Sequence, residues 1–319
     1  MPSLRARLLR LFFRIAIRRE MAAHGATEAE YVATARRVFE MGAARNLRVP
    51  RDMRIVPVDD GGVRGEWVLE RDATSVERAI LYAHGGAYVA CRPLGYRTFA
   101  AELARRTHAA VFVLDYRRAP ETRYPGALDD ALAAYDALRR RLEPDAIALA
   151  GDSAGGNLAL ATLLALRRRG LARPVAAVVT FSPWTDLTGS GASNVTNAAS
   201  DDLLAATAAD PARIYAGDAR LDDPLVSPLF GDYAGAPPLL VFASTIEVLR
   251  DDAVRLVERA TAAGTDATLV LEPGMPHVWP VFTPFLPEAG PALARTAAFL
   301  DRCWTQKTPN QPITTGGPR

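Results

Sequence analysis

The feature that most constrains the fold is a series of short, uninterrupted apolar runs separated by helical stretches. Continuous apolar runs indicate strands buried on both faces, as in a parallel sheet covered by helices. Strands alternating with helices favour right-handed crossovers and place ligands beyond the carboxyl ends of the strands. The runs span 79–83, 110–114, 146–150, 175–181, 239–243 and 267–271, and the helical stretches lie near 96–107, 126–142, 154–169, 251–263 and 290–303.

A hairpin precedes these runs, with strands at 53–58 and 63–69 that turn at Asp60-Gly61-Gly62. We therefore expect an α/β fold with a mostly parallel, eight-stranded sheet flanked by helices. The predicted domain order is cap helices at 1–50, a catalytic domain at 51–303 and a disordered tail at 304–319. Residues 183–237, with weak helical pattern around 201–216, are too long for a bare loop and predict an insertion that contributes to a cap or pocket.

The first fifty residues predict two helices, the second beginning with a capping box at Thr27 and Glu30. In the first helix, arginines interrupt every apolar stretch, so no signal-peptide core is expected. We favour packing of its apolar face on the rest of the protein, and the alternative is a basic helix lying on an anionic membrane. The apolar face comprises Leu4, Leu8, Leu11, Phe12 and Ile15, and the opposite face comprises Arg7, Arg10, Arg14 and Arg18.

Composition limits what this protein is expected to bind and where it is expected to reside. The 319 residues carry 38 Lys+Arg against 36 Asp+Glu, which argues against a nucleic-acid binder. The only two cysteines, Cys91 and Cys303, are expected to be buried free thiols, as in a cytoplasmic protein. No apolar run approaches the ~20 residues that a membrane span needs.

The sharpest motif is Gly151-Asp152-Ser153-Ala154-Gly155, which fits G-x-S-x-G between a predicted strand and a predicted helix. A nucleophile on such a strained turn needs neighbours without side chains two residues away, and Gly151 and Gly155 supply that clearance. The helix N-terminus also brings backbone N–H groups and a positive dipole end near the developing charge. The pattern predicts that Ser153 is a nucleophile.

A second motif, His84-Gly85-Gly86-Ala87, follows the strand at 79–83. Glycines there free backbone N–H groups to point at an oxyanion. Alone this would be a plain glycine turn, but its pairing with the serine motif favours an oxyanion loop.

Elimination selects the general base from four histidines. His84 belongs to the oxyanion loop, and of the other three only His277 follows the end of a strand. The order serine, acid, histidine also requires it to be last. The acid should follow the strand at 239–243. Glu247 lies on that loop, whereas Asp251 falls where a helix begins and would serve the helix dipole. We favour Glu247 and keep Asp251 as the alternative.

Over about residues 50–303 the chain resembles the bacterial hormone-sensitive-lipase family of esterases, which have the α/β-hydrolase fold. That resemblance implies a triad of Ser153, His277 and Glu247, and an N-terminal helical cap over the active site. It also implies an oxyanion hole of the Gly85, Gly86 and Ala154 N–H groups. The matching segments are 84–86, 115–121, 151–156, 182–187 and 227–229, together with those around Glu247 and His277.

Two positions depart from the family pattern. A fourth loop glycine is Ala87 here, which restricts the backbone, and the acid, most often aspartate, is Glu247. The glutamate resembles a subset of these esterases that includes lactone hydrolases.

The expected function is a carboxylesterase that cleaves small, short- to medium-chain esters through an acyl-enzyme, with no cofactor or metal. The alternatives are a lactonase or amide hydrolase with the same triad, and a non-catalytic small-molecule receptor. Tyr88 and Trp184 are candidate residues of the substrate pocket, and a homodimer is left open.

Overall fold

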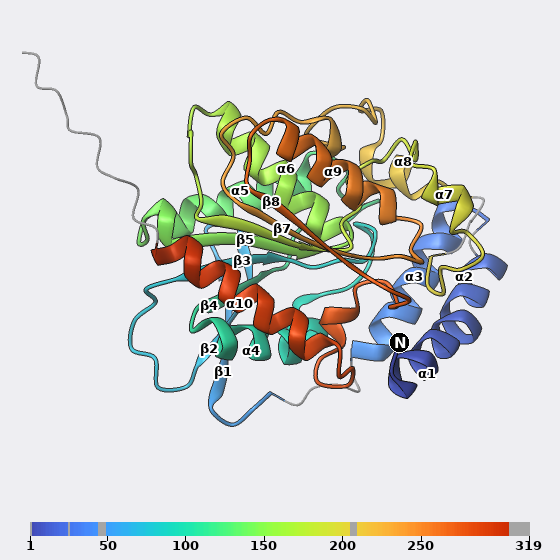
Figure 1. The fold of residues 1–319 in the computed structure, drawn as a ribbon, viewed down its shortest axis with the longest axis horizontal. Helices are drawn as coiled ribbons and strands as arrows, with labels where there is room; N and C mark the ends of the chain where they lie inside the picture. Colours follow the sequence, from blue (N-terminus) through green and yellow to red (C-terminus); the bar gives the residue numbers. More distant parts are fainter. Residues whose placement is uncertain (1, 25, 44–48, 205–208, 306–319) are drawn as a thin grey trace, which may run out of the picture.

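The structure is a computed structural model that describes residues 2–24, 26–43, 49–204 and 209–305. Its core is one eight-stranded sheet in the order β1-β2-β4-β3-β5-β6-β7-β8 (Figure 1). Strands β3 to β8 run parallel to one another, and the β1–β2 hairpin joins the sheet antiparallel through β2 and β4. The predicted mostly parallel, eight-stranded α/β sheet is confirmed. The strands are β1 (Met53–Asp60), β2 (Val63–Glu70), β3 (Ala79–Ala83), β4 (Ala110–Leu114), β5 (Ile147–Asp152), β6 (Ala177–Phe181), β7 (Leu239–Ser244) and β8 (Ala267–Glu272).

Helices cover both faces of the sheet, which explains why its central strands are continuous apolar runs. Every residue of β3 to β7 is buried. Alternate residues of a strand point to opposite faces: Leu81 packs in one core and Ile80 in the other. The first core is covered by α5 (Gly126–Arg139), α6 (Ala154–Arg168) and α9 (Arg250–Ala262), and the second by α4 (Pro93–Thr107) and α10 (Ala289–Thr305) (Figure 1).

The N-terminal helices form a separate layer. This layer consists of α1 (Leu4–Phe12), a π-helical turn at Phe13–Arg18, α2 (Arg19–Ala23) and α3 (Glu28–Ala43). Its inner residues share a third core with Val89 and Ala90, which follow β3. The helices therefore lie at the carboxyl end of the strands, at the right in Figure 1.

The capping box that opens α3 is present. The Glu30 N–H donates to the Thr27 hydroxyl oxygen (3.2 Å), and the Thr27 N–H donates to the Glu30 carboxylate (3.0 Å). Both bonds satisfy groups at the start of the helix that have no partner within it.

The prediction that the first helix packs through its apolar face is wrong. Leu4, Leu8, Leu11, Phe12 and Ile15, which we call the outer stripe, are 52–71% exposed. Three of the arginines turn inward instead: Arg10 and Arg14 pair with Asp202, and Arg18 donates to backbone carbonyls at 198 and 201. A second apolar row faces inward beside them and consists of Phe13, Ile17 and Met21. Helical spacing showed two faces but not which one has partners, because Asp202 lies far away in the sequence.

The insertion at 183–237 contains short helices, namely α7 (Ser193–Thr196), α8 (Pro211–Ala216) and a 3-10 turn at Pro228–Phe230. In the described part of 201–216, the weak helical pattern corresponds only to α8. Two further 3-10 turns lie at Pro144–Ala146 and Trp279–Phe282. In the predicted tail, residues 304 and 305 belong to α10, and 306–319 lie outside the described residues.

Candidate active site

Ser153 lies on a strained turn between β5 and α6. Its backbone has φ +52° and ψ −120°, a conformation that residues with a side chain rarely adopt. A Cβ at Gly151 would overlap the carbonyl oxygen of Gly155, and a Cβ at Gly155 would overlap that of Ala83. The two glycines are thus required by close backbone approach, as the motif predicted. Ser153 remains partly exposed, whereas Asp152 and Ala154 beside it are buried.

His277 and Glu247 are brought together by the loops that follow β8 and β7. His277 Nδ1 lies 3.7 Å from Glu247 Oε2, and the two side chains are only 3% and 1% exposed. This separation is longer than a hydrogen bond. Hydrogen bonds between catalytic groups often shorten when a substrate binds. Within the described residues, neither ring nitrogen of His277 has a hydrogen-bond partner.

Ser182, which the sequence analysis missed, joins these two loops. Its hydroxyl donates to Glu247 Oε1 (2.7 Å) and accepts from the backbone N–H of Val278 (3.1 Å). Ser182 follows β6 directly and is fully buried. The rule that polar residues at strand ends gather at one edge of the sheet could have identified it. Ser182 fixes one carboxylate oxygen and leaves the other facing the imidazole.

Burial and mutual attraction shift the pKa values of the pair. Burial raises the pKa of Glu247, because the charged carboxylate loses its hydration. Burial alone would lower the pKa of His277, but the Glu247 carboxylate and, less strongly, Asp201 and Asp152 raise it by more. These carboxylates therefore stabilise the imidazolium despite its burial.

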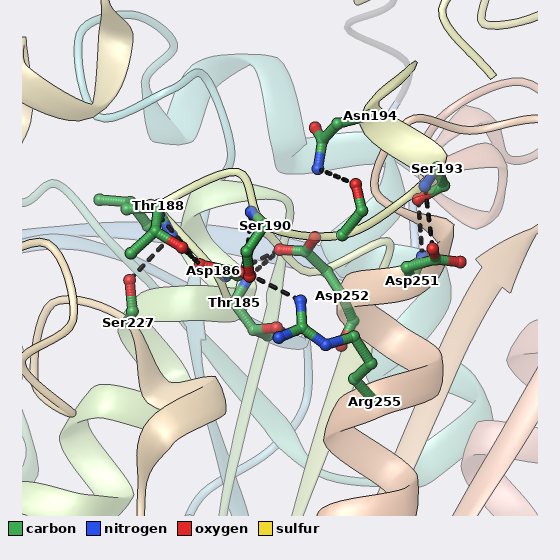
Figure 2. Close-up of polar contacts among 12 residues, drawn as sticks. Thr185, Asp186, Thr188, Ser190, Ser193, Asn194, Ser227, Asp251, Asp252 and Arg255 are labelled. Carbon is green, nitrogen blue, oxygen red and sulfur yellow. Dashed lines mark hydrogen bonds and ion pairs between the residues drawn. The ribbon is translucent and has the colours of Figure 1, made fainter. Parts of the chain in front are cut away.

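Asp251, the alternative acid, points elsewhere. It accepts from the Ser193 N–H (2.9 Å), and its own N–H donates to Ser193 Oγ (3.0 Å), as Figure 2 shows. The next residue, Asp252, accepts from the Thr185 and Asp186 N–H groups (2.7 and 2.8 Å). These carboxylates tie the insertion to the first turn of α9. Glu247, not Asp251, is the carboxylate that stands beside His277.

The other histidines do not compete for the role of base. His84 is buried, its Nδ1 lies 2.8 Å from the Gly85 carbonyl oxygen, and burial lowers its pKa to about 3. His24 and His108 are exposed.

The oxyanion loop differs from the prediction at Gly85. Its N–H already donates to Asp152 Oδ1 (3.0 Å) and to the Tyr96 hydroxyl (3.0 Å), so it is not a free donor in this structure. Across the described residues, the N–H groups of Gly86 and Ala154 donate to no acceptor. These two of the three predicted donors are available to a ligand.

Asp152 is a second residue that the sequence analysis missed. Its carboxylate accepts from the Tyr82 and Tyr96 hydroxyls (2.8 and 2.9 Å) as well as from Gly85, and burial raises its pKa to about 6. The residue before the nucleophile thus holds the oxyanion loop in place. The G-x-S-x-G motif leaves that position open, so the motif itself assigns no role to Asp152.

The two predicted pocket residues differ in exposure. Trp184 is partly exposed, and its backbone N–H donates to the Ser153 carbonyl oxygen (3.0 Å). Tyr88 is fully buried, stacks on Tyr215 and donates to Asn157 Oδ1 (2.7 Å). Trp184 is therefore partly accessible and its backbone lies beside that of the nucleophile, whereas Tyr88 is not accessible in this structure.

No group of three or more candidate metal ligands is found in the described ranges. Among the helices of those same ranges, none is long and apolar enough to cross a membrane.

Comparison with known proteins places this chain in a family. Residues 80–281 match the family model described as an alpha/beta hydrolase fold. An acetyl-hydrolase from Streptomyces hygroscopicus is 43% identical over 244 residues, which cover 75% of this chain and 80% of that protein. An esterase of the bacterial hormone-sensitive lipase (HSL) family superposes with a TM-score of 0.84 at 37% identity, over 95% of this chain and 99% of that one.

The chain belongs to the HSL family of α/β hydrolases. A further relative, an esterase from Acinetobacter venetianus, is 36% identical over 250 residues, which cover 77% of this chain and 82% of that protein. By its family the chain is a serine hydrolase of the esterase class, as the resemblance implied.

Proposed function

We propose that this HSL-family protein is a carboxylesterase that uses Ser153 as nucleophile, His277 as general base and Glu247 as the acid that orients it. The observation that carries the proposal is the buried His277–Glu247 pair, 3.7 Å apart, at the same sheet edge as the strained Ser153. A histidine beside a carboxylate and a serine on a sharp turn are the parts that acyl transfer needs.

In the proposed reaction, His277 removes the hydroxyl proton as Ser153 attacks the ester carbonyl carbon. The tetrahedral oxyanion accepts hydrogen bonds from the Gly86 and Ala154 N–H groups, and the protonated His277 then gives its proton to the leaving alcohol. Water attacks the acyl-enzyme with His277 again as base. Glu247 holds the imidazole tautomer and stabilises its positive charge, while Ser182 keeps the carboxylate in place.

We infer a preference for small acyl groups of about two to eight carbons. An acetyl-hydrolase among the relatives supports this. A lactonase or an amide hydrolase would use the same residues, so the substrate class must be measured. The cytoplasm stays the proposed compartment, because Cys91 and Cys303 are both free.

The test is a series of p-nitrophenyl esters from acetate to palmitate, with a lactone and an anilide alongside and Ser153→Ala as the blank. We expect kcat/KM to peak at or below about eight acyl carbons and to exceed the lactone and anilide values. A peak at palmitate, or a lactone hydrolysed faster than every ester, contradicts this proposal.

A further inference from the structure

The outer stripe of the first helix is the largest concentration of exposed apolar side chains in the described part of the chain. Of the eleven large hydrophobic residues that are exposed there, five belong to it: Leu4 71%, Leu8 54%, Leu11 52%, Phe12 55% and Ile15 57%. A sixth, Phe285, lies beneath the exposed Arg5 of the same helix. Single exposed hydrophobic residues are normal, but a contiguous row marks a surface that something covers.

The outer stripe is exposed although its helix is held firmly in place. The opposite side of the same helix is held by the buried Phe13 and by the Arg10 and Arg14 pairs with Asp202. The Ser3 N–H and hydroxyl also donate to the Glu288 carboxylate. The helix is therefore anchored through one side and presents the other, so rotation about its axis would break both the ion pairs and the third core.

Charge around the stripe indicates what covers it. The first nineteen residues contain six arginines and no acidic residue, whereas the other 300 residues carry 32 Lys+Arg against 36 Asp+Glu. Four of the six arginines are exposed: Arg14, which pairs with Asp202, and Arg5, Arg7 and Arg19. Arg5 donates to the Phe285 carbonyl, and the side chains of Arg7 and Arg19 have no acceptor among the described residues.

A second copy of this chain fits this face poorly, because a symmetric pairing through it would bring together two segments that each carry six arginines before their first acidic residue, Glu20, which already pairs with Arg37. An anionic lipid surface fits it well, because acyl chains would take the apolar row and headgroups the arginines. We propose that the outer stripe, with Arg7 and Arg19, binds the surface of an anionic lipid bilayer. The helix lies in the plane of the headgroups and does not cross the membrane.

This placement would bring the active-site loops close to the lipid surface. Arg10 donates to the carbonyl oxygen of Gly274, on the loop that carries His277. Asp201, whose backbone carbonyl accepts from Arg18, accepts in turn from the Val248 N–H beside Glu247. Lipid binding by the outer stripe does not require the proposed ester hydrolysis, because binding to vesicles is measured without any substrate.

The test is sedimentation of the full-length protein with phosphatidylcholine vesicles that contain phosphatidylglycerol, and with vesicles of phosphatidylcholine alone. We expect binding to the anionic vesicles that weakens as salt is raised. Leu8→Ser with Phe12→Ser should weaken binding at least tenfold, and Arg7→Gln with Arg19→Gln several-fold. Val56→Ser with Leu171→Ser, which removes two exposed apolar residues outside the N-terminal helices, should change binding less than twofold.

Each variant should keep its kcat on a water-soluble ester, which separates loss of binding from loss of fold or catalysis. The proposal is overturned if the wild-type protein ignores the anionic vesicles, or if the stripe variant binds them as the wild type does. A dimer seen by light scattering that the stripe variant disperses, without vesicle binding, would instead make this face a protein interface.

Discussion

The carboxyl edge of the sheet and the N-terminal helical layer bury apolar residues in opposite ways. At the sheet edge, strands β5 to β7 are buried on both faces, and the polar residues that follow them meet in one site. In the N-terminal layer, arginines face the protein and the outer stripe faces solvent. The apolar pattern alone thus predicts correctly which residues of the sheet are buried. It predicts the wrong buried face for the first helix.

The two patterns differ in how far they determine which side chains are buried. A continuous apolar run has no polar face, so both of its sides must be covered whatever its neighbours are. An amphipathic helix has two faces, and the one that packs depends on what the rest of the fold offers. Here the fold offers Asp202, which is almost completely buried and needs a positive partner.

The largest effect of a single substitution should be on kcat, at the carboxyl edge of the sheet. Glu247→Gln should lower kcat by about 10² or more with KM little changed, because an amide neither fixes the imidazole tautomer nor stabilises its charge. Asp251→Asn is the matched control: it removes a carboxylate four residues away that bonds Ser193, and kcat should stay near the wild-type value. A normal Glu247→Gln beside an inactive Asp251→Asn would transfer the role to Asp251.

Much of the sheet edge was predictable because its parts follow local rules. The strands, the clearance at Gly151 and Gly155, and the position of His277 after β8 came from pattern and order alone. What was missed acts across the fold: Ser182 joins two loops, and Asp152 takes the Gly85 N–H. Such contacts depend on which segments meet in space, and spacing along one sequence does not record that.

The inward arginines should contribute to stability rather than to chemistry. Arg10→Gln with Arg14→Gln leaves the 1%-exposed Asp202 carboxylate without a cation. Breaking a fully buried pair costs about 3–5 kcal/mol. Because Arg10 and Arg14 are 25% and 52% exposed, we expect a smaller loss of about 1–3 kcal/mol in the free energy of unfolding. Arg220→Gln breaks a pair with Asp222 that lies in solvent, and it should change the stability much less, because water and salt screen exposed ion pairs. Urea unfolding of the two variants compares them, and equal losses would mean that Asp202 does not need its arginines.

The oxyanion loop offers a smaller test of strain at the site. Ala87 has φ +53°, in the left-handed region, where a residue with a Cβ costs roughly 1–2 kcal/mol. Ala87→Gly relieves that strain but adds freedom to the unfolded chain, so a net gain of up to about 1 kcal/mol is expected. Thermal unfolding measures it. A clear loss of stability would show that the Ala87 methyl group packs favourably enough to outweigh the strain.

The weakest effect should be a shift of the pH profile. Since Glu247 raises the pKa of His277 above its ordinary 6.5, and only neutral imidazole acts as base, kcat/KM should fall on the acid side with a midpoint above that value. Removing the charge in Glu247→Gln lowers the pKa, so the residual activity should reach its plateau at lower pH. Rates on a soluble ester between pH 5 and 9 check this, and a midpoint unmoved in the variant contradicts the pairing.

The most direct test of the proposed catalytic site is covalent labelling by a fluorophosphonate, with the labelled residue identified and the labelling rate measured. We predict one adduct, on Ser153, located by mass spectrometry of the digested protein. Labelling should slow strongly in His277→Ala and Glu247→Gln, and it should keep the wild-type rate in Asp251→Asn and in the Leu8→Ser, Phe12→Ser variant of the outer stripe. An adduct on another serine, or labelling of Ser153 at an unchanged rate without His277, would contradict it.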